Sequence, residues 1–422
     1  MFRKSIYILL FGTAVIAGCD ILNVEDPQRF TDEDLDTKEA VEAVGDGVLG
    51  DFYVAQDDFV NVTALLADEY IHTGTWTDWQ EVTDGQVRAG RPNAADGTFN
   101  DLAQARWSAQ DAQDRIKRVL GEEGENSLNM VKAKTVEGFA NLYLGMAYCE
   151  APVESGGEAV PDQRLFERAI EVLGETRSIA ENIENDEWAN LTTAGIARAH
   201  LLAGNYSEAG AEAEEIPKGF SHEAVFSSNT GRQENEVVQL TRRGFNQAGG
   251  VHPRWWDQVD TDEEFLQDPW SDKLDPRVSI GHNEGELGVD GSTRHFTQLK
   301  YNELSANIPI AGWKEMRLVE AEVHWRDGEL SQAIDLMNSL RKEAGLPNLD
   351  DTNDKAQVRE YLLYERFAEL FLEGHRLTDL SRFGLVEEIL GKERNIKFPV
   401  STDEINSNPN ISTPRGCPDI SG

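Results

Sequence analysis

Carboxylates are the most abundant side chains in this 422-residue chain that could do chemistry, with 77 Asp and Glu against 39 Lys and Arg. Two carboxylates at a fixed separation in a cleft can hydrolyse a glycosidic bond. Acidic residues are so widespread that the sequence singles out no such pair. It also has no His-Glu-x-x-His, no Gly-x-Ser-x-Gly and no glycine-rich phosphate loop. We therefore predict that the protein is not an enzyme, and we assign no catalytic residue and no cofactor.

The acidic balance also restricts the partners. A formal net charge of −38 repels phosphate backbones, so we expect no nucleic acid partner. One acidic run has enough carboxylates for Ca²⁺ but lacks the spacing and the glycine of an EF-hand loop: Asp257, Asp260, Asp262, Glu263 and Glu264. We predict a solvated stretch there and assign no metal site.

Tryptophans in polar segments offer a different chemistry, which is binding. A sugar face lies against an aromatic ring, while its hydroxyls bond to amides and carboxylates. Side chains of these types gather in three places, and they are the predicted ligand-binding residues: Trp76, Trp79 and Asp78; Trp255, Trp256 and Asp257; and Trp270, close to Asp268. The alternative is that each ring anchors a loop against helices. The tryptophans at apolar-face positions of predicted helices are assigned to the core: Trp107, Trp188, Trp313 and Trp325.

Repeated helix pairs are predicted to support these segments. LLAGNYSEA (201–209) aligns with HWRDGELSQA (324–333), placing Gly204 on Gly328 and Ala209 on Ala333. The glycine allows a tight turn, and the alanine lets antiparallel helices approach closely. This pattern resembles the tetratricopeptide repeat. Residues 131–183 form a possible further copy, with 152–164 inserted in its turn.

The predicted fold class is mainly α: tetratricopeptide-like helix pairs form a right-handed α-superhelical scaffold, with a loop-rich variable region packed on it. We expect a first helix from Thr31 to Leu49, a short helix over Thr63–Tyr70, an ordered loop over 71–100, and a helix over Leu102–Leu120 with Trp107 inward. Glu236–Leu240 is a possible short strand. The predicted divisions are an N-terminal helical and repeat region (31–216), the variable region (217–311), C-terminal repeat helices with a closing helix (312–384) and a polar tail (385–422), with 31–422 as one structural unit.

The N-terminus carries an export signal. Arg3 and Lys4 precede an apolar run that ends in small residues before Cys19. We interpret residues 1–18 as a lipoprotein signal peptide, Cys19 as the lipidated residue and 19–30 as a lipid-anchored tether. The alternative is an ordinary signal peptide. The other two cysteines, Cys149 and Cys417, could pair, but a free, buried Cys149 is the preferred interpretation.

The stretch Arg359–Gly384 combines a broad apolar face with opposed charges three or four residues apart. Gly374 is expected to end or bend the helix, which restarts near Leu377. The charged positions are assigned a structural role, fixing how the last helices meet the earlier pairs: Glu365, Arg366, Glu369, Glu373, Arg376, Asp379 and Arg382.

Taken together, these features resemble the SusD/RagB family almost from end to end. The resemblance rests on the lipobox at Cys19, on Arg341 with Gly345-Leu346-Pro347, on the closing-helix charges, and on FPVSTDEINSNPNI (398–411). It implies an outer-membrane, lipid-anchored protein that faces the exterior. Such a protein captures a nutrient, typically a glycan, and passes it to a SusC-type TonB-dependent transporter without chemistry. The alternative is a repeat scaffold that binds a protein or peptide on its concave surface. The ligand's identity stays open.

Overall fold

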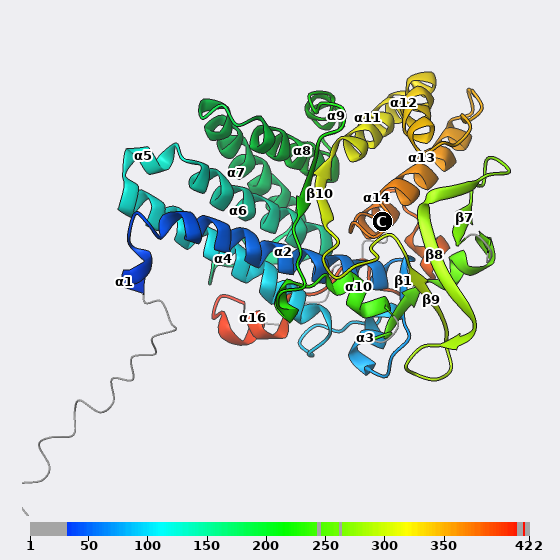
Figure 1. Ribbon diagram of the computed structural model, residues 1–422, viewed down its shortest axis with the longest axis horizontal. Helices are drawn as coiled ribbons and strands as arrows, with labels where there is room; N and C mark the ends of the chain where they lie inside the picture. The colour runs from blue at the N-terminus through cyan, green and yellow to red at the C-terminus, as the bar shows by residue number, and fades with distance from the viewer. Residues whose placement is uncertain (1–31, 243–245, 261–263, 412–416, 418–422) are drawn as a thin grey trace, which may run out of the picture.

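The computed structural model describes residues 32–242, 246–260, 264–411 and 417 (Figure 1). The predicted segments 1–18 and 19–30, together with Cys19, Thr31, Asp262 and Glu263, lie outside these ranges. Within them, no helix combines the length and the apolar character required to cross a membrane.

Helices dominate the fold, which confirms the prediction of a mainly α protein. In chain order they are α1 (Asp32–Leu35), α2 (Val41–Leu66), α3 (Thr77–Thr83), α4 (Ala95–Leu120), α5 (Glu122–Glu125), α6 (Leu128–Ala147), α7 (Asp162–Asn182), α8 (Asp186–Ala203), α9 (Tyr206–Glu214), α10 (Glu236–Thr241), α11 (Trp313–Asp327), α12 (Leu330–Glu343), α13 (Lys355–Glu369), α14 (Arg376–Arg382), α15 (Val386–Leu390) and α16 (Thr402–Ser407).

The predicted helix pairs are present as α6–α7, α8–α9 and α11–α12, and successive helices pack on one another along this series. Gly204 and Gly328 end the first helix of two pairs with φ of 81° and 83°, a left-handed conformation that favours glycine. Ala209 and Ala333 are fully buried between the paired helices. The tetratricopeptide-like pattern is therefore confirmed.

The N-terminal helix α2 is one long helix where two were predicted. It continues to Leu66, and Tyr70 already belongs to a strand, so the predicted helix over Thr63–Tyr70 is wrong at its end. Thr63 lies inside α2, where its hydroxyl donates to the Phe59 carbonyl at 2.7 Å.

The expected loop over 71–100 contains α3 and the start of α4. In α4, Ala105 and Ala109 lie on the buried face, and Trp107, two residues from each, is 50% exposed. The prediction that Trp107 points inward is therefore wrong, because helical spacing places it on the far side of α4. Trp188 and Trp313 are buried as predicted, and Trp325 is half-buried.

Short strands accompany the helices, and most lie in the region predicted as loops. They are β1 (Tyr70–His72), β2 (Glu150–Pro152), β3 (Ala159–Pro161), β4 (Ser221–Ala224), β5 (Gly249–Val251), β6 (Val259–Asp260), β7 (Phe265–Gln267), β8 (Leu274–Leu287), β9 (Arg294–Gln298) and β10 (Ile308–Gly312), with 3-10 turns η1 (Gly231–Gln233) and η2 (Pro253–Gln258).

All strand pairs are antiparallel: β1 with β5, β2 with β3, β4 with β10, and the sheet β6-β7-β8-β9. In Figure 1 the β8–β9 ribbon lies beside α13 at the right of the molecule. The possible strand Glu236–Leu240 is instead α10, because Asn235 caps a helix by accepting the Val238 N–H at 3.1 Å.

The C-terminal tail packs back on the helical body. The Phe398 N–H donates to the Ala147 carbonyl at 2.8 Å, and Phe398 is fully buried. Cys417 forms a disulfide with Cys149, with 5.5 Å between their Cα atoms. The prediction of a free Cys149 is therefore wrong, because the returning tail brings the two residues together.

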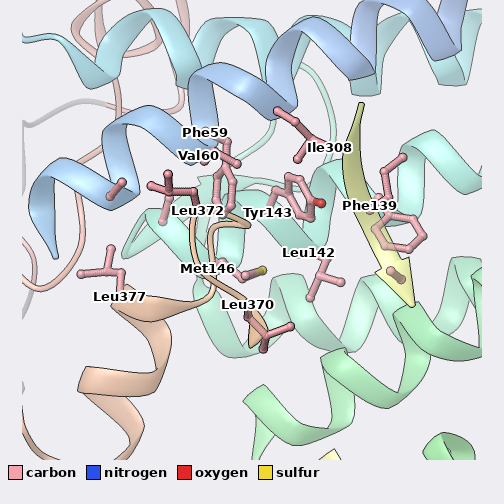
Figure 2. Packing of buried hydrophobic residues seen from close by; sticks show 14 of the residues in the cluster. Phe59, Val60, Phe139, Leu142, Tyr143, Met146, Ile308, Leu370, Leu372 and Leu377 are labelled. Carbon is pink, nitrogen blue, oxygen red and sulfur yellow. The ribbon is translucent and has the colours of Figure 1, made fainter. Parts of the chain in front are cut away.

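The core joins segments that are far apart in the chain. Figure 2 shows Phe59 of α2 and Tyr143 of α6 beside Ile308 of β10 and Leu372 of the turn between α13 and α14. The Phe59 and Tyr143 rings stack with centroids 4.5 Å apart. The closing segment is thus anchored in the same apolar core as the N-terminal helices.

Candidate ligand-binding site

Trp76 stands where strand β1 turns into helix α3. The turn fits because Gly74 carries no side chain: a Cβ there would lie 2.7 Å from His72 Cε1 and 2.9 Å from Ala248 Cβ. Trp76 is the residue before the first turn of α3, and Trp79 follows on the next turn. The strand–turn–helix geometry therefore presents the two indoles side by side.

The His72 ring packs against the indole of Trp76. The two rings stack with centroids 5.9 Å apart and 23° between their planes. The Trp76 backbone N–H donates to His72 Nε2 at 3.2 Å. Burial lowers the pKa of His72, which favours the neutral imidazole that can accept this bond.

The two indoles form a stepped aromatic surface. Their centroids are 5.9 Å apart, Trp79 is half-buried against the core, and Trp76 is 45% exposed. An indole this exposed, held in place by a buried histidine, offers a ring face to a ligand.

A cavity of about 370 Å³ lies beside these rings. Its other lining residues are polar apart from Leu240, and they come from α2, α3, α10 and the segment after α10: Asp58, Asn61, Asp78, Glu236 and Asn246. Asn61 is 2% exposed, and its Oδ1 accepts no hydrogen bond from any described residue. Such a buried acceptor costs about 1–3 kcal/mol unless a bound group satisfies it.

Neighbouring carboxyl groups modify the charge of the cavity. Burial and the adjacent Asp101, whose side chain bonds to that of Asp58, raise the pKa of Asp58 to about 7. Burial also raises the pKa of Glu236. Asp57 holds α10 in place, because its Oδ2 accepts the Glu236 N–H at 2.7 Å.

This arrangement suits a ligand with apolar faces and many hydroxyl donors. The ring face of Trp76 would take C–H groups, and Asn61, Asp58 and Asp78 would accept hydrogen bonds. The sequence singled out the Trp76, Asp78 and Trp79 segment. It did not indicate Asp58, Asn61 or Glu236, because only the packing of α2 against α10 brings them there.

The other predicted binding tryptophans lie elsewhere and are largely used in packing. Trp255 is 6% exposed, stacks on Phe367 with centroids 4.0 Å apart, and donates from Nε1 to the Asp68 carbonyl. Trp256 stacks on Phe296, and Trp270 meets Tyr361 edge-on.

The backbone of Asp257 lies in η2, and its side chain is outside what the structure describes. The structure thus does not bring the three predicted clusters into one pocket. Among the described residues, no group of three or more His, Cys, Asp or Glu side chains is placed to hold a metal ion.

Comparison with known proteins places this architecture. A model described as the SusD family matches residues 302–397, which span β10, both helices of the last pair and the closing helix. The C-terminal part of the chain therefore carries the features of the SusD family. A curated SusD-like protein of Formosa agariphila is 32% identical over 119 residues, and this match covers 26% of the present chain and 23% of the relative's length.

Solved structures of SusD-type proteins share the fold over nearly the whole chain. A SusD superfamily protein from Bacteroides vulgatus has a TM-score of 0.68 at 15% identity, covering 90% of this chain and 99% of that one. A laminarin-binding SusD-like protein has a TM-score of 0.65 at 14% identity, covering 88% and 98%.

The closing segment of the chain gathers long-range ion pairs. Arg376 bonds Asp68 of the α2–β1 connection at 2.6 Å, and Arg382 bonds Glu322 of α11. Glu365 accepts from both Arg277 and Arg341, at 2.6 and 2.7 Å.

Only some of the pairs are local in sequence. Asp379 pairs with Arg382 as the spacing suggests, and it also accepts from Arg366 at 2.8 Å. Glu373 instead pairs with Lys300, and Glu369 with Lys314. Five of the seven motif charges therefore tie the closing segment to distant parts of the chain, and the pair of Arg366 with Asp379 joins α13 to α14.

A second cavity, of about 380 Å³, opens beside this network, and each of its cations already has a carboxylate partner. Lys218 pairs with Glu343, and Lys300 and Lys314 make the pairs given above. Trp313 lies under Lys218 and is largely buried. A ligand here would have to displace existing ion pairs, so the Trp76 cavity is the better candidate site.

Proposed function

We propose that this chain is a SusD-family protein that captures an oligosaccharide at the Trp76–Trp79 surface and passes it to a SusC-type TonB-dependent transporter in the outer membrane. Capture requires a surface that binds without reacting. The stepped indoles beside the Asn61 acceptor supply such a surface, and this juxtaposition is the observation that carries the proposal.

Two relatives support the choice of ligand class. One solved structure with this fold is named a laminarin-binding SusD-like protein, and another, from Bacteroides vulgatus, a SusD-like carbohydrate-binding protein. Sugars present C–H faces and hydroxyl donors, the two features that the Trp76 cavity complements. We therefore propose a glycan over a peptide.

The membrane attachment and the partner rest on sequence and family. Cys19 follows a signal-like segment, so we propose a lipid anchor there and a location on the outer face of the outer membrane. Co-purification of the membrane-extracted protein with a TonB-dependent barrel would support the transporter partner. Loss of membrane attachment in Cys19→Ala would support the anchor.

The binding proposal is tested by calorimetry of the purified chain against laminari-, malto-, xylo- and manno-oligosaccharides. We expect at least one series to bind and Trp76→Ala to weaken that binding about tenfold or more, because a stacked aromatic contact is lost. Leu128→Ala, another exposed apolar residue but at the start of α6, is the matched control and should bind as the wild type does. Equal affinity of Trp76→Ala and Leu128→Ala would contradict the site.

A further inference from the structure

Trp107 lines a groove of about 640 Å³ between α4 and the start of α2. Half of its surface is exposed, which makes it, with Trp76, one of two exposed tryptophans in the described part of the chain. The groove floor includes the small residues Ala40, Ala43 and Gly47, and a Cβ on Gly47 would meet no atom within 4 Å. The indole therefore lies beside an open part of the groove that is lined by small residues.

Polar side chains line the same groove. Thr37 and Ser108 contribute hydroxyls, and Asp51 and Asp111 contribute carboxylates that also pair with Arg232 and Arg115. An exposed indole with carboxylates nearby is common to this groove and to the Trp76 cavity. The rest of the lining differs, because the Trp76 cavity adds amides, whereas the Trp107 groove adds hydroxyls and a larger apolar surface.

The two places lie along one edge of α2. Ala40, which precedes α2, and Ala43, Gly47 and Asp51 of α2 line the Trp107 groove, and Asp58 lines the Trp76 cavity. Successive members of this series are three, four or seven residues apart, so they share one face of the helix. Gly47 and Asp58 are eleven residues apart, which is about 16 Å along a helix axis.

Figure 1 shows α2 crossing the molecule from the end near α1 to the end near α10. Between the two places, Arg232 of η1 reaches the same edge and bonds Asp51 at 2.7 Å. Its side chain is about two-thirds exposed, so its remaining donors face outward. A guanidinium in this position can donate to hydroxyls of a chain that crosses it.

We propose that Trp107 forms a second carbohydrate subsite, and that a long oligosaccharide lies along this edge of α2 from Trp76 to Trp107. The inference rests on the proposed function of the Trp76 site. The occupant is a glycan chain because the groove repeats the aromatic and acceptor chemistry of that site and continues from it along one helix. Two linked contacts on one chain raise the affinity for long ligands, while short ligands reach only one of them.

The test compares a disaccharide and a hexasaccharide from each of the four oligosaccharide series, measured by calorimetry on wild type, Trp107→Ala, Trp76→Ala and Leu128→Ala. For the series that binds, Trp107→Ala should lower hexasaccharide affinity about tenfold to hundredfold and change disaccharide affinity less than about twofold. Trp76→Ala should weaken both, and Leu128→Ala neither.

The outcomes separate the two proposals. If Trp76→Ala weakens binding while Trp107→Ala leaves hexasaccharide affinity unchanged, the second subsite is wrong and the Trp76 site stands. The same result is expected if Trp107 instead contacts a protein partner. If no series binds the wild type, both proposals are contradicted. Circular dichroism of each variant shows whether it is folded.

Discussion

The closing helices and the Trp76 cavity both bury polar groups, but they treat them in opposite ways. Around α13, Arg341 lies fully buried between Asp268 and Glu365, and both carboxylates are fully buried too. Beside Trp76, Asn61 Oδ1 is buried without a donor, and Asp58 shares a carboxyl pair with Asp101. Each of these charges around α13 meets an opposite charge, whereas the polar groups beside Trp76 do not.

This contrast separates scaffold from site. A buried charge that meets its partner fixes the positions of the elements that carry it, and removing one member leaves the other uncompensated. A buried acceptor that meets no partner in the protein costs stability until a ligand or a water donates to it. Dense charge held in ion pairs therefore marks the structural region here, whereas an unmet acceptor beside an exposed indole marks the binding region.

The largest expected effect comes from breaking the matched region. Arg341→Met leaves Asp268 and Glu365 facing each other without that cation, so we expect a loss of about 3–5 kcal/mol in the free energy of unfolding. Urea titration followed by circular dichroism measures this loss.

The matched control for that loss is Arg164→Ala. Arg164 pairs with Glu167 and Glu171 on the exposed side of α7, with all three side chains close to half exposed. Its replacement should leave the unfolding transition nearly unchanged. Similar transitions for the two variants would show that the buried network does not hold the closing helices.

A slightly smaller effect is expected at the turn that presents the charges. Gly374 has φ of 81°, and a Cβ there would lie 2.4 Å from Phe59 Cε1. Gly374→Ala therefore adds backbone strain and a clash with the core, for which we expect a cost of about 2–4 kcal/mol.

Gly384 separates the two contributions. It has φ of 66°, but a Cβ there would meet nothing within 4 Å, so Gly384→Ala should cost only the strain, about 1–2 kcal/mol. Thermal unfolding of both variants gives the difference. Equal costs would mean that Phe59 moves aside and that the turn is not locked by the core.

What could be predicted from the sequence was local. The turns at Gly204 and Gly328 were predictable because a left-handed helix end leaves its signature within a few residues. The partner of Arg376 was not, because Asp68 is 308 positions away, and spacing along one helix suggested nearer partners. The Cys149–Cys417 pair was missed for the same reason.

The residues of the candidate site also divide into those predicted from local sequence and those that were missed. Trp76 and Asp78 were predicted because an aromatic residue among polar neighbours is visible in a short segment. Asn61 was not, because on α2 it looks like one polar residue in a helix, and its unmet acceptor exists only after α10 packs nearby. The exposure of Trp107 was also missed, because one aromatic residue does not fix which face of α4 is buried.

A moderate effect is expected from pH, with opposite signs in the two regions. Burial raises the pKa of Asp379, but Arg366 and Arg382 outweigh this effect and lower the pKa to about 2. Its unfolded pKa is about 4, so it contributes stability above pH 4 that is lost as pH falls toward 2. Asp379→Asn should remove this part of the acid sensitivity.

Asp58 has the reverse behaviour. Its pKa is raised to about 7, so from about pH 4 to pH 7 the folded protein keeps a proton that the unfolded chain has released. Stability therefore falls as pH rises through this window. The difference in free energy of unfolding between Asp58→Asn and the wild type should therefore favour the variant by about 1–2 kcal/mol more at pH 8 than at pH 5. This value already includes a reduction for solvent screening of the partly exposed carboxylate.

Urea titrations of the wild type and both variants across this pH range measure the two effects. Asp101, Glu236 and Asp57 also face Asp58 and have raised pKa values, so Asp58→Asn should remove only part of the slope. Parallel pH profiles for the wild type and Asp58→Asn would contradict the assignment of a proton-retaining carboxyl to the binding region.

The smallest expected effect on stability gives the most direct test of whether a residue has a structural role or a binding role. Asn61→Leu keeps a side chain of similar size and removes the unmet buried acceptor, so the free energy of unfolding should stay the same or rise by up to about 1 kcal/mol. The same change should weaken oligosaccharide binding about tenfold, because a hydroxyl of the ligand loses its acceptor. Unfolding and calorimetry on one preparation measure both. A loss of stability together with unchanged binding would show that Asn61 belongs to the scaffold, as Arg341 does.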